Sequence, residues 1–267
     1  MKFRLTLMCL AATWLALPLC AQSERPPDAN AQQSMLARIT EHSLHSQDQL
    51  PDFICTQLTT RSEDKSGKGS RWKKVDSLEV EFSFIGRRPR WKLLKVNEKT
   101  TRRSYDELNN GFLSDSILQF FSLPDSIFGE DARTQFAWSR WDQIDGRRME
   151  VFSLRVLARY SQLAFTNNYG SRVVGFHGLM YADPATQTVI RLELQLDLPS
   201  DFAARECSLD VDYGDVTIAE HQFLLPVKAT ARLRTPAAMA KNETQVVRYQ
   251  KYAADASVTF GDPGASK

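Results

Sequence analysis

Histidines, paired carboxylates and cysteines are the residues of this sequence that could carry chemistry. The histidines are His42, His45, His177 and His221. His42 and His45 are three residues apart, a spacing that can hold a metal ion on one helical turn, but no third ligand follows nearby. His177 stands in the apolar segment VGFHGLMY, where a strand histidine with satisfied hydrogen bonds is a simpler interpretation than a general base. We therefore expect no metal site and no cofactor.

The paired carboxylates also favour a structural interpretation. Glu79 with Glu81, and Asp210 with Asp212, are spaced by two, so each pair shares one face of a strand. A hydrolase needs carboxyl groups that converge on one cleft from different elements, and the sequence contains no GxSxG nucleophile motif. We assign no catalytic residue and expect a protein that is not an enzyme, with an uncharacterised hydrolase as the remaining alternative.

The first 21 residues have the pattern of a secretory signal peptide. Lys2 and Arg4 precede an apolar stretch that ends at the small-residue site Leu19-Cys20-Ala21. We expect cleavage after Ala21 and a periplasmic or secreted protein. A lipoprotein acylated at Cys20 is the alternative, which the large side chain of Leu19 disfavours. No later segment is apolar enough to cross a membrane as a helix.

Removal of this peptide leaves two cysteines, Cys55 and Cys207. In an oxidising compartment such a pair favours a disulfide, which could stabilise the fold by up to about 5 kcal/mol because it closes a long loop. Two separate buried thiols are the alternative.

Charge is balanced in the mature chain but unevenly distributed. The formal net charge of +2 falls to zero without Lys2 and Arg4, which argues against nucleic-acid binding. Residues 61–103 contain 14 basic and 6 acidic residues. Within them, Arg87, Arg88, Arg90 and Lys92 form a candidate patch for an anionic membrane or an envelope protein. The alternative is a solvated outer face of two strands.

The chain predicts one domain over residues 34–260. It is preceded by a disordered lead-in at 22–33, rich in Pro, Ala and Gln, and followed by a flexible tail at 261–267. Helical spacing predicts a helix from about 33 to 47. The segment DSILQFFSL is a second amphipathic candidate.

From Phe53 onward the apolar period changes to two, which predicts strands with one apolar and one polar face. Asp145-Gly146 is a hairpin turn signal. In VIRLELQLDLP, a slip of one residue would expose five aliphatic side chains, so the register is strongly fixed. The apolar phase slips at Gly214, which predicts a β-bulge, and Pro226 favours an edge or a bulge.

Alternation on one face with hairpin turns predicts a mainly β, α+β fold: a single strongly curved, unclosed antiparallel sheet, with an N-terminal helix and one or two helices capping its concave face. Such a concavity is a candidate binding site for an apolar ligand. From alternation alone, the residues expected to line it are Phe82, Phe84, Phe152, Leu154, Leu192, Leu194 and Leu196.

Five segments carry a resemblance to known proteins: LPDFICTQ, RWKLLKVN, FHGLMYADPATQTVIRLELQLDLP, VDYGDVTIAEHQFLLPVKATARLR and NETQVVRYQKY. In this order they resemble an uncharacterised group of secreted proteins of acidobacterial type. The architecture is similar to the lipoprotein-carrier superfamily of LolA, LolB and RseB. This resemblance implies a concavity that binds a lipid or a lipoprotein acyl chain, without a cofactor. An RseB-like interaction module without a ligand is the alternative.

Overall fold

The computed structural model describes residues 25–104, 106–108, 120–167 and 170–253. Its main element is an antiparallel sheet of 11 strands in the order β4-β3-β2-β1-β13-β12-β11-β10-β9-β6-β5. The strands are β1 (Phe53–Asp64), β2 (Lys73–Ile85), β3 (Arg88–Val96), β4 (Lys99–Thr100), β5 (Gln135–Ile144), β6 (Arg147–Val156), β9 (Gly175–Asp183), β10 (Thr188–Asp197), β11 (Glu206–Ile218), β12 (His221–Arg234) and β13 (Met239–Lys251).

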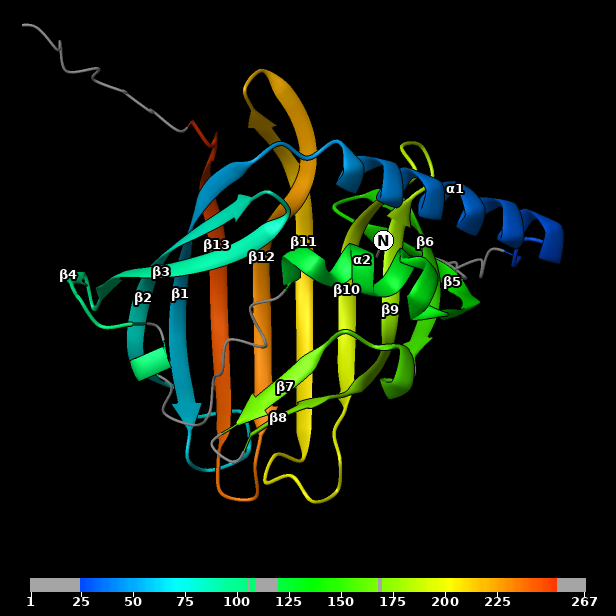
Figure 1. The fold of residues 1–267 in the computed structure, drawn as a ribbon. Coiled ribbons are helices and arrows are strands. Elements are labelled where there is room, and N and C mark those ends of the chain that lie inside the picture. Colours follow the sequence, from blue (N-terminus) through cyan, green and yellow to red (C-terminus); the bar gives the residue numbers. More distant parts are fainter. Residues whose placement is uncertain (1–24, 105, 109–119, 168–169, 254–267) are drawn as a thin grey trace, which may run out of the picture.

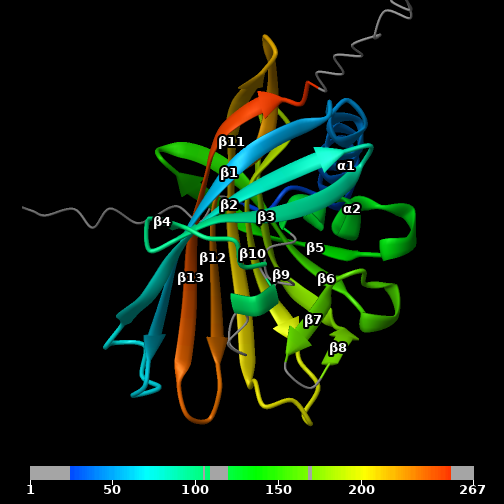
Figure 2. The same cartoon turned by 60° about the vertical axis from the view of Figure 1, so that its left-hand side comes forward.

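One face of this sheet is covered by the helices α1 (Ala29–Asp48) and α2 (Leu123–Phe128) and by the separate hairpin of β7 (Ala164–Asn167) and β8 (Gly170–Val173), as Figure 1 shows. The strands β1 to β3 lean across the others when the molecule is turned (Figure 2). The edge strands β4 and β5 do not pair with each other. The predicted curved, unclosed half-barrel with helices on its concave face is confirmed.

The N-terminal helix starts earlier than its periodicity predicts. Asp28 is the N-cap, and its side chain accepts a hydrogen bond of 2.9 Å from the backbone N–H of Ala31. Residues 29–33 are therefore helical, which corrects the expectation of a disordered lead-in over the whole of 22–33. The predicted signal peptide, its cleavage site and the tail at 261–267 lie outside the described residues, as does most of DSILQFFSL, whose last residue opens α2. None of the described helices is long and apolar enough to span a membrane.

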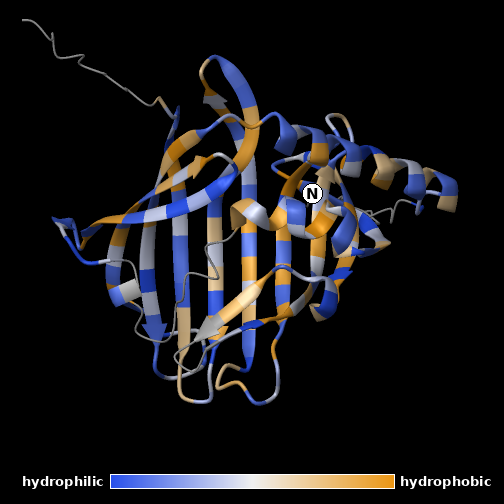
Figure 3. Ribbon diagram, in the orientation of Figure 1, coloured by the Kyte–Doolittle hydropathy of each residue, from blue (hydrophilic) through white to orange (hydrophobic). Residues whose placement is uncertain are grey.

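Alternation along the strands decides which side chains face the helices. In β10, Leu192, Leu194 and Leu196 are buried while the residues between them are partly exposed, and Figure 3 shows the resulting stripes of apolar and polar residues. Leu194 pairs with Leu209 of β11. The hairpin predicted at Asp145-Gly146 joins β5 to β6, and both residues have positive φ, of 51° and 75°.

The predicted bulge is present in the β11–β12 hairpin, and its extra residue is Val227. Asp212 pairs with Lys228 and the next residue, Tyr213, pairs with Pro226. Gly214 allows this bulge, because a Cβ atom there would lie only 3.0 Å from the Val227 side chain. Since β12 pairs with β13 only from Lys228 to Arg234, Pro226 lies where β12 is an edge, as predicted.

The predicted disulfide between Cys55 and Cys207 is wrong, since both are free and buried thiols. Cys55 lies near the start of β1, whereas Cys207 of β11 aligns through Leu233 and Ala240 with Glu63, near the other end of β1. Along the sheet, the two sites are three strands and eight residues apart, about 14 Å by about 26 Å. A disulfide bridges Cα atoms within about 7 Å.

Burial predicts that neither thiol reacts in the folded protein. It raises the pKa of the Cys207 thiol to about 12 and that of Cys55 further above its usual value, so the reactive thiolate is scarce at neutral pH. For a chain that begins at Gln22, we expect fewer than about 0.1 thiols to react with a chromogenic disulfide reagent at pH 8. Both should react in denaturant without a reductant. Two fewer free thiols under denaturing conditions would instead indicate a disulfide.

Candidate functional site

The concave face brings together the residues predicted to line a ligand site. Phe82, Phe152, Leu154, Leu192, Leu194 and Leu196 are all at most 7% exposed and belong to one cluster, against which Phe84 packs partly buried. The same cluster contains Ile39 of α1 and Leu123 and Ile127 of α2. In this conformation the face is therefore covered by the helices. That these residues contact a ligand stays a prediction.

Aromatic side chains fill the end of the face near β1 and β2. The ring of Phe82 stacks on Phe121 at 4.1 Å between centroids. Phe53 lies within 6.0 Å of the Phe82 and Phe121 rings and 5.7 Å from Tyr249. Phe121 lies two residues before the start of α2, so these stacked rings hold the helical layer against the sheet.

Two small voids remain between the helices and the sheet. One, of about 40 Å³, lies between α1, α2 and the strands β10 to β12, and the other, of about 10 Å³, lies beside Phe53 and Phe84. Both are lined by Gln47, Pro124, Tyr213 and Leu224, and we call these four residues the seam. Since one water needs about 10 to 15 Å³ of such space, these voids hold a few waters at most, and an acyl chain enters here only if the helices move away from the sheet.

Two tyrosine hydroxyl groups, those of Tyr213 and Tyr249, lie near the seam. The hydroxyl of Tyr213 is buried and has no hydrogen-bond partner within the described part of the chain. Burial raises its pKa above the usual value, so it stays neutral. The hydroxyl of Tyr249 instead donates to the carbonyl of Pro226 at 2.5 Å, across the place where β12 and β13 separate. The seam thus lies beside a gap in the backbone pairing of the sheet.

A buried carboxylate lies on the same face, at Glu150 of β6. It pairs with Ala182, is 1% exposed, and its Oε2 has no hydrogen-bond partner among the described residues. Burial raises its pKa, while Arg38 of α1 and Arg148 lower it. Because the pKa in the folded state is raised, the folded protein gains stability from this group as the pH falls and loses it as the pH rises through that pKa.

We expect Glu150→Gln to stabilise the protein by about 1 kcal/mol at pH 8, because the amide is isosteric and uncharged. The difference from the unmodified chain should shrink as the pH is lowered to 4. Urea unfolding at both pH values measures it, with the exposed Glu107→Gln as the control. An equal effect at both pH values would show that folding does not raise the pKa of Glu150.

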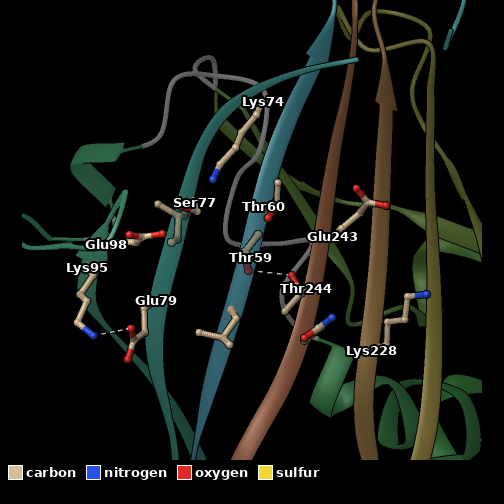
Figure 4. A pocket seen from close by; sticks show the side chains of 13 residues that line it. Thr59, Thr60, Lys74, Ser77, Glu79, Lys95, Glu98, Lys228, Glu243 and Thr244 are labelled. Atoms are coloured by element: carbon tan, nitrogen blue, oxygen red, sulfur yellow. Dashed lines mark hydrogen bonds and ion pairs between the residues drawn. The ribbon is translucent and has the colours of Figure 1, made fainter. Parts of the chain in front are cut away.

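A larger cavity, of about 620 Å³, lies on the opposite face, across β12, β13, β1 and β2 (Figure 4). Its walls carry charges of both signs. Lys95 pairs with Glu79 at 2.8 Å, and Glu243 pairs at 3.0 Å with Lys241, which lies outside the wall. The hydrogen bond to Lys95 lowers the pKa of Glu79. Lys74 points toward the centre in Figure 4. This cavity was not predicted from the sequence. The bulge at Val75, between Asp76 and Lys74, exists only through the pairing of β2 with β1.

Comparisons with known proteins identify neighbours in fold. No family model and no curated protein matches this chain. It is similar to solved structures. A DUF1329 family protein from Desulfovibrio piger has a TM-score of 0.41 and 9% identity, over 83% of this chain and 93% of that one. A putative outer membrane lipoprotein-sorting protein domain from Vibrio parahaemolyticus has a TM-score of 0.38 and 9% identity, over 85% and 96%. The lipoprotein LppX of Mycobacterium tuberculosis has a TM-score of 0.29 and 9% identity, over 80% and 94%.

Two of these three structures are described as a lipoprotein-sorting protein domain and a lipoprotein, and none of the three TM-scores reaches 0.5. At 9% identity the likeness concerns the course of the chain alone. The function is therefore argued below from the residues of this chain.

The residues of the predicted basic patch share the convex face of β3 and its preceding turn. Arg88, Arg90 and Lys92 are exposed at alternating positions of β3. Arg87 lies in the turn between β2 and β3 and forms an ion pair of 3.4 Å with Asp48 at the end of α1. Arg88, Arg90 and Lys92 thus form one exposed row, which we call the basic row, while Arg87 links the turn to the helix.

The residues considered for catalysis are placed apart. His177 lies on the convex face, where its Nδ1 is 2.8 Å from Asp197 and that carboxylate also pairs with Arg155. Asp210 forms an ion pair with Arg232, and Asp212 forms one with Arg191. Among the described residues, no group of three or more His, Cys, Asp or Glu side chains could hold a metal ion.

Proposed function

We propose that this chain is a non-enzymatic envelope protein that holds an apolar ligand, a lipid or lipoprotein acyl chain, between its concave face and its helical layer. One observation carries the proposal: a single apolar cluster runs along the concave face from β2 to β6, whereas the helices that cover it beside β10 to β12 leave the seam. Of the 20 residues of α1, Ile39 is the one fully buried.

The weak attachment of α1 supports this function physically. Besides Ile39, α1 places only the partly buried Met35, Leu36 and Leu44 against the cluster, so at about 25 cal/mol per Å² its apolar burial is modest for a helix of 20 residues. The elements that move in binding proteins come from such low-stability parts. When the helices move, an acyl chain replaces their side chains on the sheet, so the face stays dry.

Purified protein that begins at Gln22 tests the proposal. We expect native mass spectrometry and solvent extraction to find lipid that exchanges with a fluorescent fatty acid. Leu224→Trp, which fills the seam, should reduce the rate of uptake at least about tenfold, the effect of 1.4 kcal/mol on a barrier. Phe223→Trp, at the adjacent position of β12, is the matched control. A chain that folds but takes up no fatty acid would contradict the proposal.

A second candidate function is an RseB-like interaction module, in which the filled concave face is structural and the basic row docks a partner or membrane. The exposure of Arg88, Arg90 and Lys92 on one face favours it.

For this candidate we expect Arg88→Glu with Arg90→Glu to weaken binding to vesicles containing phosphatidylserine at least about tenfold, since each cation near such a surface contributes about 1 kcal/mol. The effect should fade in 0.5 M NaCl because salt screens exposed charges. Arg159→Glu with Arg205→Glu, the same change in net charge at other exposed positions, is the control. Equal binding by both pairs would leave the basic row as a solvated surface.

A further inference from the structure

Polar residues form a stripe across the concave face, next to the apolar part. On β1, Gln57, Thr59 and Arg61 alternate in phase with the buried Phe53 and Cys55. Cross-strand pairing continues the stripe from Thr59 to Thr244, and from Arg61 to Asn242 on one side and Asp76 on the other. We call these six residues the polar stripe: Gln57, Thr59, Arg61, Asp76, Asn242 and Thr244.

Part of the polar stripe is satisfied internally. The hydroxyl groups of Thr59 and Thr244 are 2.8 Å apart. The guanidinium of Arg61 donates to both carboxylate oxygens of Asp76, with 2.6 Å from Nε to Oδ1, and also to the carbonyl of Leu108 at 3.3 Å. These contacts fix the charged pair and leave no net charge on it.

The amide side chains of the polar stripe are not satisfied. Gln57 is 0% exposed, and neither its Nε2 nor its Oε1 has a hydrogen-bond partner in the described part of the chain. Asn242 is 2% exposed, and its Oδ1 has no hydrogen-bond partner among the described residues. Native proteins satisfy nearly all such groups, because a buried unpaired amide is destabilising. Two unsatisfied amides on one face of neighbouring strands indicate that another molecule supplies the partners.

Small side chains of β12 lie beside the polar stripe on the concave face. Thr244 and Asn242 pair across to Ala229 and Ala231 of β12, where the opposite side of the sheet carries long side chains such as Lys228 and Arg232. Toward the other end of β1, the stripe meets Phe53 and the stacked Phe82. A ligand on this face would therefore contact aromatic rings with one part and amides with the other.

The charges of the polar stripe select a neutral group. An amide donates through its NH₂ group and accepts through its oxygen, which suits an ester, an amide or a hydroxyl. A carboxylate or phosphate would need an unpaired cation here, and Arg61 is already neutralised by Asp76. An ionised group buried without a counter-ion is strongly disfavoured.

We infer that the polar stripe binds the neutral ester, amide or hydroxyl groups that join acyl chains in a glycerolipid, through Gln57 and Asn242, while the chains lie on the apolar part of the face. This inference rests on the proposed function and narrows it. The protein then distinguishes acylglycerols from free fatty acids of the same chain length.

The test compares 1-monooleoylglycerol with oleate at pH 9, where the carboxylate is ionised, by competition against a bound fluorescent fatty acid. We expect the delipidated chain that begins at Gln22 to bind the monoacylglycerol at least about tenfold more tightly, a difference of 1.4 kcal/mol. Gln57→Leu and Asn242→Leu should remove this preference and leave oleate binding within about twofold. Gln245→Leu, on the opposite face of β13, is the matched control. Gln57→Met serves if Gln57→Leu fails to fold by circular dichroism.

The outcomes separate this inference from the function on which it rests. Equal binding of both lipids by the unmodified chain overturns the inference and supports the proposed function. A preference that survives Gln57→Leu and Asn242→Leu also overturns it, because the amides then do not determine which lipid binds. Binding of neither lipid overturns both proposals.

Discussion

Leu194→Asp is expected to abolish folding. Leu194 is 2% exposed in the middle of β10, paired with Leu209 on one side and Gly178 on the other. The change removes about 2 to 3 kcal/mol of apolar burial and places an unpaired carboxylate in the core, which adds a further desolvation cost. Together these approach the whole stability of a typical domain, about 5 to 15 kcal/mol.

Soluble yield and the thermal transition by circular dichroism measure this effect. Gln195→Asp puts the same side chain on the opposite face of the same strand and should change the free energy of unfolding by less than about 0.5 kcal/mol. The result also bears on the proposed function. If Leu194→Asp folds normally and loses fatty-acid uptake alone, Leu194 lines an open pocket and the packed conformation is not the resting state.

Strand periodicity predicted the part of the site that is apolar throughout. In VIRLELQLDLP the alternation predicts which residues face inward, and Leu192, Leu194 and Leu196 lie as expected. Ile190 does not, because the register shifts between Val189 and Arg191 and Ile190 packs in another cluster, with Val151 and Tyr181. The turn at Asp145-Gly146 was predictable because its geometry requires positive φ at two successive residues. Both signals are local, so no knowledge of the partner strands was needed.

The polar stripe could not be predicted in this way. Gln57, Thr59 and Arg61 occupy inward positions of β1 by parity, but a polar residue at an inward position looks like a break in the pattern. Its explanation lies in Asp76 and Thr244, which only the pairing of β1 with β2 and β13 brings close. The parity of Gln57 with Phe53 and Cys55 was the signal available in the sequence.

The false disulfide has a related cause. The pairing of Cys55 with Cys207 was predicted from the oxidising compartment and from the even number of cysteines. Neither observation says where the two residues lie in the fold. Strand order decides the matter, because β13 and β12 lie between β1 and β11. The early start of α1 has a different cause. Asp28 after two prolines is a local N-cap signal, but the helix was predicted from the spacing of its apolar residues, which begins later.

Asp76→Ala is expected to destabilise the protein by about 3 to 5 kcal/mol, because it removes the carboxylate that pairs with the buried Arg61. The side chain of Arg61 is 5% exposed and that of Asp76 is 12% exposed. Urea unfolding measures the loss. Lys95→Ala breaks the pair with Glu79, in which Lys95 is 41% exposed, and should cost less than about 1 kcal/mol.

Two further measurements separate burial of the charge from loss of contacts. In 1 M NaCl, the effect of Lys95→Ala should nearly vanish, whereas that of Asp76→Ala should persist, since salt screens a buried charge weakly. The double change Arg61→Met with Asp76→Leu should recover most of the stability, because apolar side chains of similar volume remove the desolvation cost of both ions. If Asp76→Ala alone costs less than about 1 kcal/mol, Arg61 reaches water in the folded protein. The neutrality of the pair with Asp76 would then no longer argue against anionic lipids as ligands of the concave face.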